Sequence, residues 1–243
     1  DGRSDDVTDV LAKDVIAPLY GAYAALSRNR RARGVLDLDL PERKVIINDR
    51  GTVAEIALRE RFDSHRLIEE FMITANVAAA EALEKKSLPC MYRIHDQPSP
   101  TKVSALSDAL ETIGLKIAKS QVMQSGIFNQ ILAKAKGGPF ERMVQELVLR
   151  SQAQAEYSPD NIGHFGLALR RYCHFTSPIR RYSDLLVHRA LIRGGRMGDG
   201  ALETGHKDFA EMGQHLSFTE RRAAAAERAA VDRFTTQFLA DRV

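Results

Sequence analysis

The stretch that decides the fold runs from residue 172 to residue 189 and reads Tyr172-Cys-His-Phe-Thr-Ser-Pro-Ile-Arg-Arg-Tyr-Ser-Asp-Leu-Leu-Val-His-Arg189. Thr176 and Ser177 are residue types that cap helix N-termini, and Pro178 suits the first helical position. The pattern therefore predicts a helix that opens at Ser177-Pro178 and ends before Gly194.

Two arginines, Arg180 and Arg181, would then occupy the first turn of this helix. Cations at that end oppose the helix dipole and cost about 0.3–1 kcal/mol each. A bound anion would offset the cost, because backbone N–H groups and a guanidinium fork would converge on one phosphate. The alternative is a surface helix whose arginines pair locally, for instance Arg180 with Asp184 four residues on. The spacing alone leaves both interpretations open.

Outward from this stretch, the chain is expected to be mostly helical. Capping residues, proline starts and glycine stops indicate the ends of the helices. The predicted helices cover residues 63 or 64 to about 86, 99 to 114, 125 to 136, 139 to 154, and about 207 to the end.

The first sixty residues predict the remaining elements. Residues 18–33 form a helix with Gly34 as its stop. Leucines alternate with aspartates over residues 36–40, which predicts a half-buried strand. Two short strands within residues 44–58 flank Asn48–Gly51 and read as a hairpin. The fold class is therefore α+β, mostly helical, with a small antiparallel sheet near the N-terminus.

Composition excludes some classes of protein. The chain has 243 residues, of which 44% are hydrophobic and 28% charged, which is globular rather than disordered usage. A net charge of +3 is too small to establish a nucleic-acid partner by itself. Cys90 and Cys173 lie far apart in the sequence, which predicts free thiols in a reducing compartment. Because no run of about 18 apolar residues occurs, no membrane partner is expected. A chain that begins with Asp1 is expected to come from a longer one.

Two acids, Glu69 and Glu70, stand near the start of the predicted helix from residue 63. Glu69 and Asn76 are seven residues apart and share a face near an apolar stripe of Ile68, Met72, Ala75, Ala79 and Ala82. A carboxylate and an amide beside a core need partners, so they could bind a ribose hydroxyl or hold an arginine. The alternative is an acid favoured by the helix dipole and a satisfied buried asparagine.

Other charged residues favour plainer interpretations. His164 and His174 lack metal-ligand spacing and are interpreted as structural. Asp37 and Asp39 would share a solvated strand face. The basic run from Arg28 to Arg33 is explained by the helix dipole and solvation, with RNA backbone contact as the sharper alternative.

Four blocks together resemble the ribonuclease II and ribonuclease R family, and the last two look specifically like ribonuclease R. The resemblance covers nearly the whole chain and favours the functional interpretation of Arg180 and Glu69. The blocks are Leu67-Ile-Glu-Glu-Phe-Met-Ile, Tyr92-Arg-Ile-His-Asp with Pro98-Ser-Pro100, Asn161-Ile-Gly-His-Phe-Gly-Leu-Ala-Leu, and His174-Phe-Thr-Ser-Pro-Ile-Arg-Arg-Tyr-Ser-Asp-Leu.

The resemblance implies that residues 1–243 are the C-terminal part of one 3′→5′ exoribonuclease catalytic domain. Such enzymes hydrolyse single-stranded RNA to nucleoside 5′-monophosphates with two metal ions, here expected to be Mg²⁺. Arg180 would contact the scissile phosphate and Glu69 the terminal nucleotide, as catalytic residues. Glu227 falls near a family position on the last helix that influences RNA release. The expected RNA-binding residues are Thr176, Ser177, Arg181, Tyr182, Glu70 and Glu227.

Several features of the family pattern are missing from this sequence. The family's metal-binding aspartates and its stacking tyrosine would lie upstream, and Leu36 and Asp37 stand where a second stacking aromatic is expected. The flanking RNA-binding barrels are also missing. We therefore expect no metal ligand here, an inactive isolated chain, a cytoplasmic location, and two partners: single-stranded RNA and the rest of the parent chain. The alternatives are a non-catalytic RNA-binding module from a degenerate family member and a helical interaction domain without an RNA role.

Overall fold

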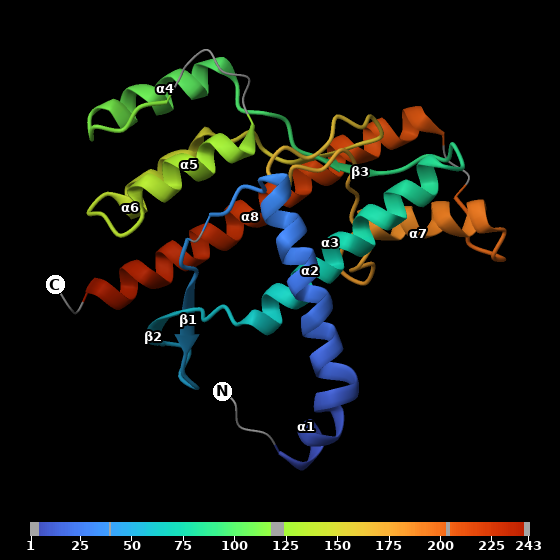
Figure 1. The fold of residues 1–243 in the computed structure, drawn as a ribbon, viewed down its shortest axis with the longest axis horizontal. Helices are drawn as coiled ribbons and strands as arrows, with labels where there is room; N and C mark the ends of the chain where they lie inside the picture. Colours follow the sequence, from blue (N-terminus) through green and yellow to red (C-terminus); the bar gives the residue numbers. More distant parts are fainter. Residues whose placement is uncertain (1–4, 39, 118–123, 203–204, 241–243) are drawn as a thin grey trace.

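The computed structural model describes residues 5–38, 40–117, 124–202 and 205–240, and it confirms a mostly helical α+β class (Figure 1). The helices are α1 (Asp6–Leu11), the π-helix η1 (Ala12–Ile16), α2 (Ala17–Arg33), α3 (Asp63–Glu84), α4 (Pro100–Glu111), α5 (Ser125–Ala135), α6 (Glu141–Ser151), α7 (Tyr182–Gly195) and α8 (His206–Ala240). The strands are β1 (Arg43–Ile47), β2 (Val53–Leu58), β3 (Tyr92–Ile94) and β4 (Glu156–Ser158).

The predicted hairpin is confirmed as the antiparallel pair β1–β2, in which Val45 lies opposite Ile56. The Asn48 side chain accepts hydrogen bonds from the backbone N–H groups of Arg50 and Thr52, which closes the turn. A second antiparallel pair, β3–β4, was not predicted. Its strands have three residues each, too few for an alternating pattern to be recognised.

The predicted strand over residues 36–40 is wrong for residues 36–38 and 40, and Asp39 lies outside the described residues. The Leu36 N–H donates to the Gly166 carbonyl at 2.9 Å, and the Asp37 N–H donates to the Asn129 side chain at 3.0 Å. Leu36 and Leu38 pack against buried helices instead of a sheet. The alternation of leucine and aspartate therefore reflects alternating burial of the side chains of residues 36–38. These residues pair with no strand in the described part of the chain.

The helix expected to open at Ser177-Pro178 begins later, at Tyr182. The Ser177 carbonyl accepts hydrogen bonds from the N–H groups of Arg180 and Arg181 at 3.3 and 3.1 Å, so residues 177–181 form a tight turn. Arg181 has an extended conformation at the N-cap. Both arginines thus precede the helix, and neither occupies its first turn. The expected last helix is confirmed over the described residues of α8; its final three residues lie outside them.

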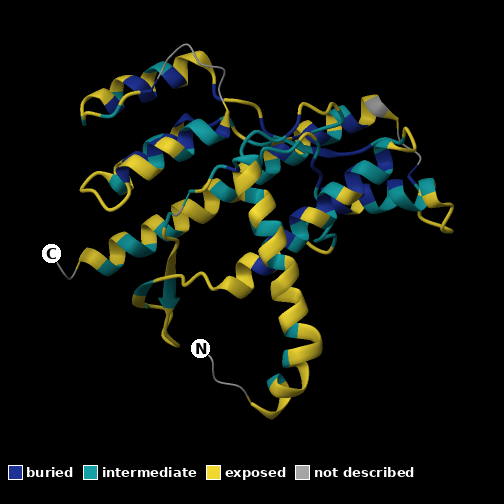
Figure 2. Ribbon diagram, in the orientation of Figure 1, coloured by how far each residue is buried: buried dark blue, intermediate teal, exposed yellow. Residues whose placement is uncertain are grey.

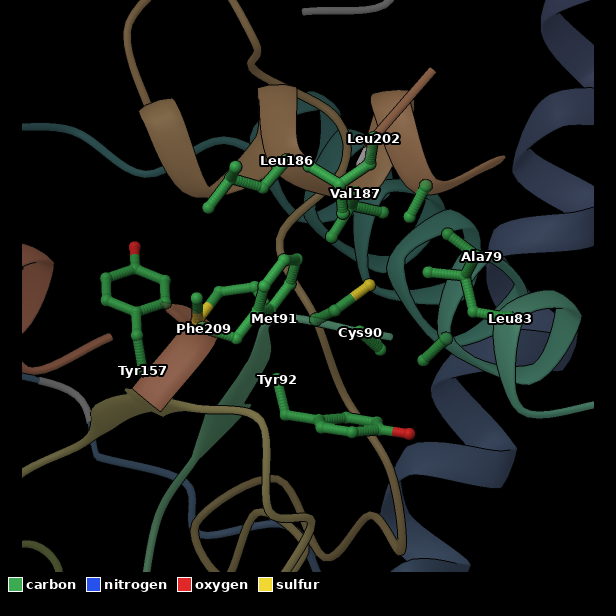
Figure 3. Close-up of a cluster of buried hydrophobic side chains, with 13 residues drawn as sticks. Ala79, Leu83, Cys90, Met91, Tyr92, Tyr157, Leu186, Val187, Leu202 and Phe209 are labelled. Atoms are coloured by element: carbon green, nitrogen blue, oxygen red, sulfur yellow. The ribbon is translucent and has the colours of Figure 1, made fainter. Parts of the chain in front are cut away.

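A first hydrophobic cluster joins α3, β3, β4, α7 and the first part of α8 (Figure 3). Cys90 and Cys173 are buried there as free thiols, as predicted. A Cβ atom at Gly213 would lie 2.5 Å from the Tyr157 carbonyl oxygen, so the backbones of α8 and β4 are in contact. Two turns further along α8, Glu220 accepts two hydrogen bonds from Arg93, at 2.7 and 3.1 Å.

A second hydrophobic cluster is built by α4, α5 and α6, which lie together at the upper left of Figure 1. Leu110, Phe128, Val144 and Val148 are fully buried in it. Outside both clusters, α1, η1 and α2 contain no buried residue, and the second half of α8 is largely exposed (Figure 2). Among the described residues, no helix is both long and apolar enough to span a membrane.

Candidate nucleic-acid interface

Helix α3 carries two of the predicted site residues, and its buried face differs from the expected one. Leu67, Glu70, Ile73 and Asn76 are buried at intervals of three residues, whereas Ile68 is 56% exposed. The predicted apolar stripe is therefore wrong by about one position at this end of the helix. Glu70, rather than Glu69, shares the buried face with Asn76.

Glu69 and Glu70 on α3 are both held by arginines. The Arg30 guanidinium on α2 donates to Glu70 at 2.7 Å and lies 3.5 Å from Glu69, which also pairs with Arg61. A buried carboxylate without such a partner would be costly. Holding an arginine was one of the roles left open for Glu69, and both Glu69 and Glu70 hold one. Arg30 belongs to the basic run of residues 28–33. No sequence pattern linked this run to Glu70, which lies forty residues further along.

Asn76 attaches α3 to the segment that leads into the arginine turn. Its side-chain amide donates to the Tyr172 hydroxyl at 3.0 Å, and its side-chain oxygen accepts from the Phe175 N–H at 2.9 Å. Its backbone carbonyl accepts from the Cys173 thiol at 3.3 Å. The expected satisfied, buried asparagine is thus confirmed, and it fixes the path of residues 172–175.

Asp184 locks the turn itself. Its carboxylate is fully buried and accepts two hydrogen bonds from Arg181, both 2.8 Å, and one from the Ser177 N–H, also 2.8 Å. Burial alone would raise the pKa of Asp184, but the hydrogen bonds from Arg181 and Ser177 outweigh it and the pKa is lowered. The local ion pair considered for Arg180 and Asp184 is therefore made by Arg181 instead.

The outer side of the turn consists of Ile179, Arg180 and Tyr182. The Ile179 side chain is entirely exposed, Arg180 is exposed, and Tyr182 is about half exposed. Within the described residues, Arg180 makes no hydrogen bond or ion pair that would hold its guanidinium. The Thr176 hydroxyl oxygen lies beneath the turn, buried and without a hydrogen-bond partner among those residues. The guanidinium of Arg180 is therefore accessible to a ligand.

Two clefts meet at Glu69. The larger, of about 580 Å³, lies between α2, α3, α5 and α6 and is lined by Arg30, Arg31, Arg61, Arg66, Glu69 and Glu70, among others. The smaller, of about 320 Å³, is lined by His65, Glu69, Asn76, Tyr172 and Arg181, among others. The structure thus brings Glu69, Glu70 and Arg181 together. Glu227 is exposed on the second half of α8 and is not among the described residues that line either cleft.

A ladder of buried and partly buried aromatic rings includes Tyr172 and His174, which precede the turn. His95, His164, Tyr172, His174 and Tyr157 follow one another with ring centroids 5.0 to 5.7 Å apart. Burial lowers the pKa of His164 and of His174 to about 3, so both rings are neutral at physiological pH. His174 shares a 2.9 Å hydrogen bond with the Tyr157 hydroxyl. These contacts agree with the structural role predicted for both histidines.

A metal site would need several His, Cys, Asp or Glu side chains close together. Over the part of the chain that the structure describes, no three side chains of His, Cys, Asp and Glu gather in a way that would hold a metal ion. Glu69 and Glu70 are also engaged by arginines. A two-metal centre needs several free carboxylate oxygens, so these residues do not fit one.

Comparison with known proteins defines the class. The profile of the RNB domain matches residues 2–194, and the chain belongs to the RNB-domain family. Within that family it resembles ribonuclease R: it is 42% identical over 221 residues to "Ribonuclease R" of Aquifex aeolicus, covering 91% of this chain and 31% of that protein. It is 37% identical over 234 residues to "Ribonuclease R" of Escherichia coli, covering 93% and 29%. The chain thus spans about a third of the length of these relatives.

The fold is also shared with a solved structure. It superposes on "Mycoplasma genitalium RNase R in complex with ribose methylated single-stranded RNA" with a TM-score of 0.88 and 25% sequence identity. The match covers all of this chain and 38% of that one. The resemblance predicted from the four sequence blocks is therefore confirmed.

Proposed function

We propose that residues 1–243 form part of the catalytic domain of a processive 3′→5′ exoribonuclease, which hydrolyses single-stranded RNA to nucleoside 5′-monophosphates. The observation that carries this proposal is the exposed Arg180, whose guanidinium pairs with no other described residue, on a turn locked by Asp184 in a chain whose relatives are ribonuclease R. Such a turn fixes the backbone around Arg180 and leaves its guanidinium exposed to an incoming phosphate, which it can bind with two N–H groups.

Arg180 is proposed to bind the scissile phosphate. Its guanidinium can contact two phosphate oxygens at once, and it can stabilise the negative charge that grows during hydrolysis. Arg181 has two of its N–H groups committed to Asp184, so its main contribution is to position the turn. Arg181 also lines the smaller cleft, where RNA contact is proposed.

Glu69 is proposed to accept a hydrogen bond from a ribose hydroxyl of the terminal nucleotide, because it lies where the two clefts meet. Glu70 supports it indirectly by fixing Arg30, which lies beside both acids. Tyr182 is proposed to contact RNA from the outer side of the turn, and Thr176 and Ser177 from its base. Glu227 keeps its proposed influence on RNA release.

Hydrolysis by this family is proposed to need Mg²⁺. Because the described residues do not fit a two-metal site, we assign no step of the reaction to them through a metal. We therefore propose that the isolated chain does not hydrolyse RNA. Incubation of the purified chain with end-labelled single-stranded RNA and Mg²⁺ or Mn²⁺ tests this. Release of labelled mononucleotides would contradict it.

Binding of single-stranded RNA by the isolated chain tests the phosphate-contacting turn. Affinity is expected to be weak and to fall steeply with salt, since each phosphate contact releases about 0.7 counterion from a single strand. Contacts from Arg180 and from the basic run of residues 28–33 would produce this dependence. Equal affinity at 50 and 300 mM salt, roughly the range in which such binding collapses, would rule out the electrostatic account.

The role of Arg180 is tested in an active ribonuclease that carries this domain together with its metal ligands. Arg180→Lys keeps the charge but loses the planar fork, so single-turnover rates should fall by about 10²–10³ while RNA binding stays close to normal. Arg181→Lys is the matched control. It should change the rate much less and lower the melting temperature instead, because one ammonium cannot replace both hydrogen bonds to Asp184. Equal rate effects would show that the assignment to Arg180 is wrong.

A non-catalytic RNA-binding module is the second candidate, favoured by the lack of a metal donor cluster among the described residues. RNA binding without hydrolysis in every form of the protein would support it. For either candidate we propose a cytoplasmic location, which the two buried free thiols support because such thiols are typical of reducing compartments.

A further inference from the structure

Phe62 is an unusual residue at the start of α3. The N-cap position favours Ser, Thr, Asp or Asn, whose side chains bind the first N–H groups of a helix, and Phe62 has no such group. Its own N–H donates to Nδ1 of His65 at 3.1 Å, which orders the first turn without any contribution from the phenyl ring. The ring is 55% exposed. Nothing in the start of the helix therefore accounts for an aromatic side chain here.

Residues next to Phe62 in the sequence line the two clefts, although Phe62 itself lines neither. Its ring contacts that of His65, with centroids 5.5 Å apart and planes tilted by 36°. Arg61 and Arg66 line the larger cleft, and His65 lines the smaller one. Arg61 is also ion-paired to Glu69, the proposed contact of the terminal nucleotide. The exposed ring is thus one residue from a side chain that touches the centre of the proposed RNA site.

Sites for unpaired nucleic acid alternate exposed aromatic rings with cations that follow the phosphates. Sites for protein partners instead present broad apolar patches. In the sequence, Phe62 is flanked by Arg61, Asp63, His65 and Arg66, an alternation of one aromatic ring with cations that fits the first description. Both arginines keep about half of their side-chain surface exposed while paired with acids.

We infer that Phe62, backed by His65, is a stacking platform for one base of single-stranded RNA, next to the nucleotide that Glu69 contacts. The inference rests on the proposed function and adds a base-binding position to it. A base that stacks on the ring covers its exposed surface, while Arg61 and Arg66 meet the flanking phosphates.

The absence of tryptophan from the sequence allows a direct test. F62W places the chain's single tryptophan on the proposed platform. Titration with an oligoadenylate in the presence of EDTA should quench its fluorescence to saturation, and a ribose-phosphate oligomer of the same length without bases should leave it unchanged. F218W is the matched control: Phe218 is 56% exposed beside Arg222 on α8, and Arg222 lines neither cleft, whereas Arg61 and His65 beside Phe62 each line one. Its fluorescence should not respond.

Affinity provides the second measurement. F62A should weaken oligoadenylate binding roughly fivefold to a hundredfold and leave binding of the base-free oligomer unchanged, and F62Y should bind like the wild type. Unfolding curves of F62A should match those of the wild type, because the ring is mostly exposed. Wild-type affinity of F62A for oligoadenylate, or equal quenching of F62W and F218W, would overturn the platform while leaving salt-dependent binding intact. A wild-type chain that binds no RNA would overturn the platform and the proposed function together.

Discussion

The two hydrophobic clusters are built differently. The elements of the first cluster also bury the carboxylates of Glu70 and Asp184 and the amide of Asn76, each with hydrogen-bond partners. The buried polar residues of α4, α5 and α6 are serines and Gln152, all uncharged. An apolar core fixes volume, whereas a hydrogen-bonded carboxylate also fixes direction. Every proposed site residue except Glu227 lies on or beside α3 and α7, where direction is fixed.

The largest expected effect is that of replacing Asp184, which should lower both stability and RNA affinity and so distinguish the first cluster from the second. Asp184→Ala leaves the part-buried Arg181 guanidinium and the Ser177 N–H without their acceptor, so the free energy of unfolding should fall by about 3–5 kcal/mol. RNA affinity should fall as well, because the turn loses its lock. Urea unfolding and RNA titration measure both. Asp232→Ala, at an exposed position on α8, is the control and should lie within about 0.5 kcal/mol of the wild type.

In the second cluster, truncation should affect stability alone. Leu110 is fully buried, and Leu110→Ala removes its contacts and leaves a cavity, which typically costs about 2–5 kcal/mol. At temperatures where the variant is folded, its RNA affinity should equal that of the wild type. A parallel loss of affinity would show that the two clusters do not act separately.

The ladder of rings in the first cluster should make stability depend on pH. His164 and His174 have folded-state pKa values of about 3, below the unfolded value of about 6.5, so the unfolded chain binds more protons as the pH falls. Their stabilising contribution is complete above pH 6.5 and is lost progressively down to about pH 3. At pH 5 the loss is on the order of 2 kcal/mol for each histidine.

Single variants check this pH dependence. His174→Gln should reduce the loss of stability between pH 7 and pH 5 by about 2 kcal/mol relative to the wild type. His215→Gln, an exposed position on α8, should leave the profile as it is. Chemical unfolding at a series of pH values gives both results, and identical profiles for the two variants would exclude the buried ring as the cause.

The smallest expected effect lies at the start of α4. The Ser99 hydroxyl caps this helix by accepting the Lys102 N–H at 3.4 Å, a long hydrogen bond. Ser99→Ala should therefore cost about 0.5–1 kcal/mol, the lower part of the range for helix caps. Thermal unfolding of the variant measures it, and RNA affinity should not change.

The sequence predicted best what depends on neighbouring residues. The hairpin around Asn48 and most helices follow from local periodicity, caps and glycine stops. The strand over residues 36–40 and the helix start at Ser177 were wrong because distant or buried partners decided them: Gly166 for Leu36, and Asp184 for Ser177. A strand needs a neighbouring strand, and a local pattern cannot supply one.

The candidate site divides in the same way. The resemblance to ribonuclease R singled out Arg180 and Glu69, whereas spacing alone did not decide between function and local pairing. The partnership of Arg30 with Glu70 spans forty residues and left no local signal. Its only trace in the sequence is that an acid on a buried helix face requires a partner. Phe62 left no such trace, because Asp63 or Ser64 was the expected start of the helix and the structure places the N-cap at Phe62.

The contact at Gly213 gives α8 the mechanics of a lever. Backbone touches backbone there, and Glu220 provides a second support two turns along, so the helix has a fulcrum and a short arm inside the first cluster. The long arm runs 27 residues from Gly213 to Ala240, roughly 40 Å at 1.5 Å per residue. A tilt of about 5° at the fulcrum would swing Ala240 by about 3.5 Å. Because α8 also packs against β1 and β2, Gly213 and the hairpin together set the direction of the arm that carries Glu227.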